Sequence, residues 1–150
     1  MALTTFCTLF SGSSGNAVYL GTDEGSILID CGMSGKQTLE AMTRAGLDPA
    51  GLRAIFITHE HSDHVKGAGV LSRKLELPIY ATEGTWEGME DALGAVAAHN
   101  RIVINAVLDT VKELRSLGVH ADSRIEELED GVQVIVTIHR PVPAQKTDIL

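Results

Sequence analysis

The sequence has few cysteines, no long apolar run and few basic residues, and each shortage excludes a class of protein. Its two cysteines, Cys7 and Cys31, are too few for a disulfide scaffold and lack a C-x-x-C spacing, so we expect reduced thiols. No apolar stretch approaches the roughly 20 residues of a membrane-spanning helix. The residues from Met1 to Thr5 contain no basic segment of the kind that opens a signal peptide. We therefore expect a soluble, cytoplasmic protein that does not enter a membrane.

The shortage of basic residues limits how the chain can bind nucleic acid. Lysine and arginine number 12 against 20 aspartates and glutamates, which gives a net charge of −8. This balance argues against binding of nucleic acid by surface charge alone. It does not exclude a nuclease, because bound divalent cations reverse the local field and can hold a phosphate.

The alternation of apolar runs with turn residues predicts a layered α/β domain, and 150 residues suffice for one domain with its own core. We expect strands at 3–10, 16–21, 26–30, 52–58 and 79–81. Helices are expected between Ser34 and Gly46, at 65–77 with Val70, Leu71 and Leu75 inward, and at about 85–93. Beyond about residue 95 we expect a helix over 105–116 and a hairpin of strands 124–129 and 132–138.

Three histidines and an aspartate follow directly after the apolar run 54–57, in the segment His59-Glu60-His61-Ser62-Asp63-His64, which we call the metal loop. Imidazole nitrogens and carboxylate oxygens are ligands that suit zinc, iron or manganese. We expect residues 59, 61 and 63 to share one side of an extended segment, with the turn into the next helix bringing His64 round. Two pairs of ligands would then face two neighbouring metal positions. An ordinary polar loop is the weaker alternative, because loops seldom contain so many ligand side chains.

The metal loop matches in full the H-x-H-x-D-H motif, and on these residues the chain resembles the metallo-β-lactamase superfamily. Within it, residues 11–16, 30–32, 58–67 and 78–82, with Trp86, look like the YycJ/WalJ branch of metal-dependent phosphodiesterases and exonucleases. The resemblance covers roughly residues 3–94. It implies the N-terminal half of an αββα-layered fold, followed over 95–150 by a divergent α-β-β segment.

The resemblance also implies a set of ligands. His59 and His61 would hold a first metal, and Asp63 with His64 a second, most simply two zinc ions with manganese or iron as alternatives. Asp63 would in addition orient a metal-bound hydroxide that attacks phosphorus. Asp30 would hydrogen-bond to the metal loop and orient it, a role compatible with the simpler one of a strand-end aspartate that turns the chain.

The function implied by the resemblance is hydrolysis of phosphodiesters in single-stranded nucleic acid. A superfamily hydrolase that acts on a thioester or a lactam would use the same four ligands. A non-catalytic metal-binding or interaction protein is the alternative from another class. The last alternative is an inactive truncated relative.

A complete member of the superfamily supplies further ligands, for which His99, His120 and His139 are the remaining histidines. His139 follows the predicted hairpin and is the candidate ligand, with an ordinary strand-end histidine as its alternative. His99 and His120 stand in loop-like contexts, and we expect both to be exposed. The missing ligands predict a truncated or recombined relative, or a chain that takes ligands from a second subunit. An uncovered sheet edge also predicts a homo-oligomer.

Three other features allow two interpretations each. The loop 11–15 is a plain hairpin turn or a phosphate contact through Ser13 and Ser14, and without a following lysine it is no Walker motif. Cys31 is expected to be a buried structural thiol rather than a neighbour of the metal. Trp86 has Met89 and Leu93 at helical spacing, so we expect it to pack in the core rather than stack on a base.

Overall fold

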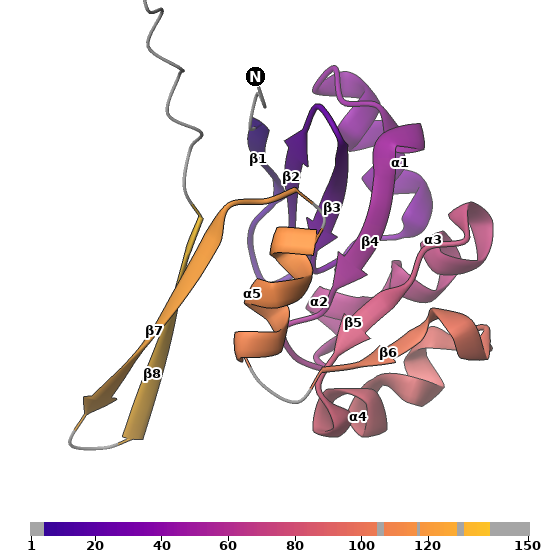
Figure 1. Cartoon of the computed structure of the whole chain (residues 1–150). Coiled ribbons are helices and arrows are strands. Elements are labelled where there is room, and N and C mark those ends of the chain that lie inside the picture. Colours follow the sequence, from indigo (N-terminus) through magenta and orange to yellow (C-terminus); the bar gives the residue numbers. More distant parts are fainter. Residues whose placement is uncertain (1–4, 105–106, 117, 129–130, 139–150) are drawn as a thin grey trace, which may run out of the picture.

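A computed structural model describes residues 5–104, 107–116, 118–128 and 131–138 of the chain (Figure 1). Within these residues a six-stranded sheet has the order β1-β2-β3-β4-β5-β6. Its antiparallel part consists of β1 (Thr5–Phe10), β2 (Ala17–Thr22) and β3 (Gly25–Ile29). Its parallel part continues from β3 through β4 (Leu52–Phe56), β5 (Ile79–Ala81) and β6 (Arg101–Val103). The carboxyl ends of β3 and β4 therefore meet at one edge of the sheet.

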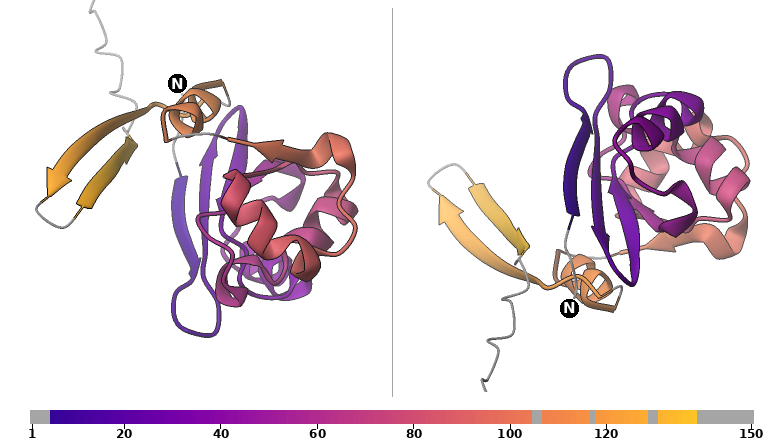
Figure 2. Two further views of the ribbon diagram at one scale, coloured as in Figure 1. Left: turned by 90° about the horizontal axis from the view of Figure 1, so that it is seen from below. Right: turned by 90° about the horizontal axis from the view of Figure 1, so that it is seen from above.

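Helices cover the two faces of this sheet unequally (Figures 1 and 2). One face carries α1 (Gly35–Arg44), α2 (Ser62–Val65), α3 (Ala68–Leu75) and α4 (Glu83–Leu93). The other carries α5 (Val107–Ser116). Short 3₁₀ turns occupy Pro49–Gly51 and Ala98–Asn100. The antiparallel pair β7 (Ala121–Leu128) and β8 (Gly131–Ile138) lies apart from the larger sheet and projects away from it (Figure 2).

The alternation of side chains along the strands divides the core into two parts. Leu28 is fully buried among residues of α1, α3 and α4, whereas its neighbour Ile27 packs on the opposite face with Val111 and Leu114 of α5. Successive strand residues point to opposite faces, so a strand that is covered on both sides is apolar throughout. This explains the apolar run Ala54-Ile55-Phe56 of β4, which follows the exposed Arg53, and the run holds the start of the metal loop on a rigid strand.

Most of the predicted elements are confirmed, and α1 shows why. Ser34 Oγ accepts from the backbone N–H of Gln37 at 3.2 Å, and Gln37 Oε1 accepts from the N–H of Ser34 at 3.3 Å, which forms a capping box. Gly46 follows the helix with a φ of +72°, a left-handed conformation that glycine adopts without strain. Local capping chemistry therefore determines both ends of this helix.

The prediction of one helix over 65–77 is wrong, because the chain forms α2 and α3 with a break at Lys66 and Gly67. In a continuous helix the N–H of Gly67 would donate to the carbonyl of Asp63. It donates instead to the carbonyl of Cys31 at 2.8 Å, and the Asp63 carbonyl accepts from the N–H of Asn16 at 2.8 Å. Hydrogen bonds to a distant segment thus end α2 after one turn.

Two smaller expectations also fail. Val70 was expected on the inner face of its helix, but it is 49% exposed, and α3 instead buries Ala68, Leu71 and Ser72. The short edge strand β6 has no counterpart among the predicted strands, since three residues leave too little alternation to detect.

The divergent segment after about residue 95 forms the expected helix and two strands, α5, β7 and β8, although β7 begins at Ala121 rather than 124.

The organisation of the chain as one domain, and its self-association, stay predictions. β1 is an edge strand of the sheet, and its Phe6 is 66% exposed. No helix within the described residues is both long and apolar enough to cross a membrane.

Candidate metal centre

Asp30 lies directly after β3, where the chain leaves the sheet. Its N–H donates to the carbonyl of Phe56 at 2.8 Å and so continues the pairing with β4 by one residue. Its φ of +60° then turns the chain sharply, in a conformation that aspartate tolerates better than most residues. The carboxylate is buried, with the residue only 6% exposed, and it faces the start of the metal loop.

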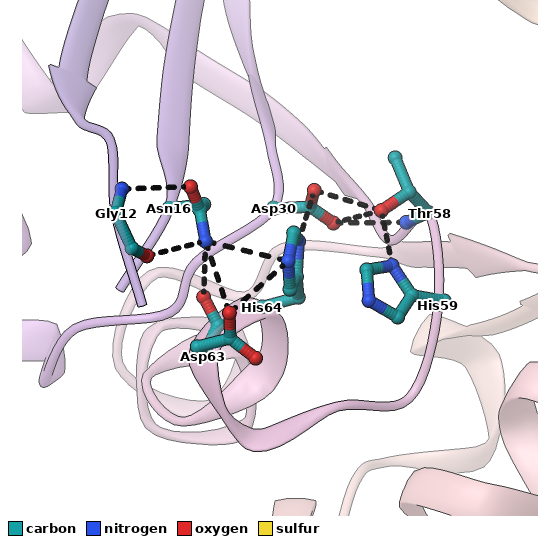
Figure 3. Close-up of polar contacts among 7 residues, drawn as sticks. All are labelled: Gly12, Asn16, Asp30, Thr58, His59, Asp63 and His64. Carbon is teal, nitrogen blue, oxygen red and sulfur yellow. Dashed lines mark hydrogen bonds and ion pairs between the residues drawn. The ribbon is translucent and has the colours of Figure 1, made fainter. Parts of the chain in front are cut away.

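The carboxylate of Asp30 joins the strand end of β4 to α2 (Figure 3). Its Oδ1 accepts from the N–H of Thr58 at 2.9 Å, and Thr58 Oγ1 lies 3.0 Å from Oδ1 and 2.8 Å from Oδ2. Oδ2 also lies 2.7 Å from His64 Nδ1. Because a carboxylate oxygen accepts, the His64 ring donates from Nδ1, and in the neutral ring Nε2 then carries the lone pair that can bind a metal.

The three imidazoles of the metal loop lie together. The ring centroid of His59 is 4.6 Å from that of His61 and 3.9 Å from that of His64. His59 Nδ1 lies 3.0 Å from Thr58 Oγ1, and His61 is exposed to solvent. The prediction that 59, 61 and 63 share an extended segment holds only as far as His61, because Asp63 stands in the first turn of α2 beside His64.

Asn16 contacts the metal loop, although the sequence motif does not predict it. Its side-chain Nδ2 lies 3.2 Å from Asp63 Oδ2 and 3.3 Å from His64 Nε2 (Figure 3). Its backbone N–H donates to the Asp63 carbonyl at 2.8 Å. The sequence signals for Asn16 are its place in the segment 11–16, which contributes to the family resemblance, and its place at the end of the loop 11–15. That loop does link the antiparallel strands β1 and β2, as the hairpin interpretation predicts. Phosphate contact by that loop stays a prediction.

The side chains of the metal loop suit a divalent cation in their chemistry, but they do not form a closed cage. Within the described residues, no group of three or more histidine, cysteine, aspartate or glutamate side chains is arranged to hold a metal ion. The ligand atoms converge in pairs, as with Asp63 Oδ2 and His64 Nε2, which are 3.4 Å apart. The arrangement therefore fits a site that further ligands must complete.

The other candidate histidines do not join this group. His99 lies near Glu76, with 3.5 Å between Nε2 and the carboxylate and 72% of its side chain exposed, and His120 is also exposed. Both agree with expectation. His139 lies outside the described residues, so its role as a ligand stays a prediction. Trp86 is 1% exposed and donates from Nε1 to the carbonyl of Ile102 at 3.0 Å, which confirms that it packs in the core.

An apolar cavity of about 320 Å³ opens beside the start of the metal loop. Thr58 is its polar member, and its other walls come from β3, β4, α5 and the end of β8. Its lining is Ile29, Phe56, Ile57, Thr58, Ile104, Leu114 and Ile138. The metal loop is thus bordered on the α5 side by apolar surface.

Cys31 is fully buried next to Asp30, and we predict that its thiol is inert in the folded protein. Burial raises the pKa of Cys31 from 9.0 to about 11, and a hydrogen bond with Thr38 offsets part of that rise. The thiolate, which is the reactive form, is therefore scarce at neutral pH. An alkylating reagent followed by mass spectrometry should modify the half-buried Cys7 and leave Cys31 intact until denaturant is added.

The same shift has a consequence at alkaline pH. Because the pKa of Cys31 is higher in the folded state, the contribution of its buried, protonated thiol to the free energy of unfolding is fully present below pH 9. This contribution is lost as the pH rises towards 11.

The alkylation test can also refute the prediction of an inert thiol. Alkylation of both thiols at the same rate in the native protein would show that Cys31 is accessible.

Comparison with known proteins identifies relatives of this chain. The family model of the metallo-β-lactamase superfamily matches residues 11–144. An exodeoxyribonuclease YycJ of Bacillus anthracis is 43% identical over 123 residues, which cover 79% of this chain and 46% of that protein. An exodeoxyribonuclease WalJ of Streptococcus pneumoniae is 47% identical over 87 residues, covering 58% of this chain and 32% of that one. A ribonuclease Z of Mycolicibacterium paratuberculosis is 33% identical over 130 residues, covering 77% and 44%. The chain thus spans less than half the length of these relatives.

Solved structures share the fold. A metallo-β-lactamase of Cronobacter sakazakii with a HARLDQ motif superposes with a TM-score of 0.53 at 26% identity, over 65% of this chain and 42% of that one. A β-lactamase of Chitinophaga pinensis superposes with a TM-score of 0.59 at 13% identity, over 89% and 58%, and shows the fold alone. The predicted α/β fold class and family resemblance are confirmed, but the expectation that the resemblance ends at about residue 94 is wrong, because the family model extends to residue 144. The chain belongs to the metallo-β-lactamase superfamily.

Proposed function

We propose that this chain carries metal ligands of a divalent-metal-dependent hydrolase that cleaves phosphodiester bonds in single-stranded nucleic acid. The observation that carries the proposal is the contact of Asp30 with His64, which aims the lone pair of His64 Nε2 to the side where Asp63 Oδ2 lies. The names of the relatives, exodeoxyribonuclease and ribonuclease, support the phosphodiester substrate. The low cysteine content supports a cytoplasmic location.

The proposed ligands are His59 and His61 for one cation and Asp63 and His64 for another, and zinc suits this set of nitrogen and oxygen donors. When bound, such cations lower the pKa of water towards neutrality and polarise phosphoryl oxygens. Asp30 fixes the orientation and tautomer of the His64 ring, and Thr58 holds the Asp30 carboxylate in place. An acidic protein of net charge −8 would hold a polyanion through these cations rather than through its own surface.

The test compares purified wild type, His61→Ala and, as the matched control, His120→Ala, each loaded with zinc or manganese. We expect two metals per wild-type chain, fewer in His61→Ala and an unchanged number in His120→Ala, because His120 is an exposed histidine outside the metal loop. Elemental analysis measures the stoichiometry. The same samples are then offered single-stranded DNA, S-lactoylglutathione and nitrocefin, and we expect turnover of the DNA by wild type and control but not by His61→Ala.

Each other outcome contradicts part of the proposal. Turnover of the thioester or the lactam in place of DNA would indicate a different hydrolase. Full metal content without turnover of any substrate would indicate a metal-binding protein that is not a catalyst, an alternative favoured by the absence of a three-ligand group within the described residues. Equal metal content in all three proteins would remove His61 from the ligands.

A further inference from the structure

Two atoms of the metal loop, Asp63 Oδ2 and His64 Nε2, lie close together. In the neutral imidazole that can bind a metal, His64 donates from Nδ1 to Asp30, so its Nε2 accepts, and a carboxylate oxygen such as Asp63 Oδ2 accepts as well. These two atoms are 3.4 Å apart. Two acceptors repel each other at this distance unless a donor or a cation contacts both of them.

The side-chain amide of Asn16 is the donor that contacts both. Its Nδ2 lies 3.2 Å from Asp63 Oδ2 and 3.3 Å from His64 Nε2 (Figure 3). The neighbouring contacts fix which end of the amide is nitrogen. Oδ1 accepts from the N–H of Gly12 at 3.1 Å, and Nδ2 faces the carbonyl of Gly12 at 2.9 Å and that of Asp63 at 3.3 Å.

The hydrogen bonds of this amide differ in strength. Nδ2 has two hydrogens for four acceptors, and the Gly12 carbonyl, at 2.9 Å, is the nearest of them. The remaining hydrogen is shared among the longer contacts to the metal loop, and shared bonds at such distances are weak. An arriving cation can therefore replace the amide at Asp63 and His64, while the two contacts with Gly12 keep Asn16 in place.

We propose that Asn16 is a positioning residue that keeps Asp63 Oδ2 and His64 Nε2 together before a cation binds. Its amide contacts both atoms, as a cation held by them would, and so keeps the carboxylate from turning away to solvent. Of the two ligands, Asp63 depends on it more, because His64 is also held by Asp30. The inference rests on the proposed function, in which Asp63 and His64 bind the same metal.

The first test is the affinity of Asn16→Ala for zinc, measured by titration calorimetry on the metal-free full chain. The backbone contacts remain in this variant, because the N–H of residue 16 still donates to Asp63 and its carbonyl still accepts from Gly32. We expect zinc binding to weaken about tenfold, as is common when a residue that orients a ligand is removed. The matched control is Gln37→Ala, which removes an amide from the capping box of α1 and should leave the affinity unchanged.

The second test separates positioning from a general loss of structure. In the metal-free protein, the ¹⁵N resonances of the His64 ring report each nitrogen separately. Asn16→Ala should move the Nε2 resonance towards the value of an acceptor without a hydrogen bond, and it should leave Nδ1 unchanged because Asp30 is intact. A variant that merely loses folded structure would move both resonances.

The results distinguish this inference from the proposed function. If wild type and Asn16→Ala bind zinc equally well, or if the variant binds more tightly, the role of Asn16 is refuted and the proposed function stands. An unchanged Nε2 resonance would also refute it. If wild type itself binds no zinc, the proposed function fails and the positioning role fails with it.

Discussion

Replacement of Gly32 by alanine should destabilise the whole protein and separate the metal loop from the sheet. A Cβ at this position would lie 1.7 Å from the carbonyl oxygen of Asp63 and 2.6 Å from the backbone nitrogen of Asn16. Both are backbone atoms, so no side chain can turn aside to make room. Two backbone hydrogen bonds of 2.8 Å, from Asn16 to Asp63 and from Gly32 to Asn16, would have to stretch or break.

The expected loss in the free energy of unfolding is about 3 kcal/mol, the sum of an overpacked contact and weakened buried hydrogen bonds. Urea denaturation followed by circular dichroism measures it. The matched control is Gly84→Ala in α4, where an added Cβ would meet no other atom within 4 Å, and there we expect a gain of roughly 0.5–1 kcal/mol from helix propensity. Equal midpoints for Gly32→Ala and wild type would refute the close approach of Gly32 to Asp63.

Replacement of Asp30 by asparagine should weaken zinc binding by about 10–100-fold, the range found for residues that orient metal ligands. Both oxygens of Asp30 act as acceptors, Oδ1 towards the N–H of Thr58 at 2.9 Å and Oδ2 towards His64 Nδ1 at 2.7 Å. An amide has only one such oxygen. If it keeps the contact with Thr58, its NH₂ group faces His64 Nδ1, and the ring must carry its proton on Nε2, where the metal needs a lone pair.

The variant isolates this effect because asparagine tolerates the φ of +60° at residue 30 as well as aspartate does. Calorimetric titration with zinc measures the affinity, and the ring ¹⁵N resonances report the tautomer of His64. Asp48→Asn is the matched control. Asp48 accepts from the N–H of Ala50 at 2.9 Å in the turn before β4, at the opposite end of that strand from the metal loop. The zinc affinity of this variant should equal that of wild type. Zinc binding by Asp30→Asn at wild-type strength would show that the proton on His64 is not controlled by Asp30.

The elements predicted well are those whose signals are local. α1 has its capping box and its terminal glycine within the segment it forms, and the apolar run of β4 records burial on both faces. The errors arise where distant segments decide. α2 ends after Val65 because Asn16 and Cys31 take up the backbone groups that would have continued the helix. The local signals in this segment, Gly67 and Gly69, weaken a helix but do not determine where it breaks.

The sequence by itself determined the ligand types, their spacing in the metal loop, the strand that precedes them and the family to which they belong, because all of these lie in short contiguous segments. Only the tertiary structure decided that the carboxylate of Asp30 contacts His64, and that the amide of Asn16, 47 residues before Asp63, lies between two ligand atoms. These side chains, far apart in the sequence, meet only because β2 pairs antiparallel with β3 and β3 pairs parallel with β4, which brings the start of β2 and the ends of β3 and β4 together. Pairing between strands follows from the packing of the whole sheet and leaves no pattern in the local sequence.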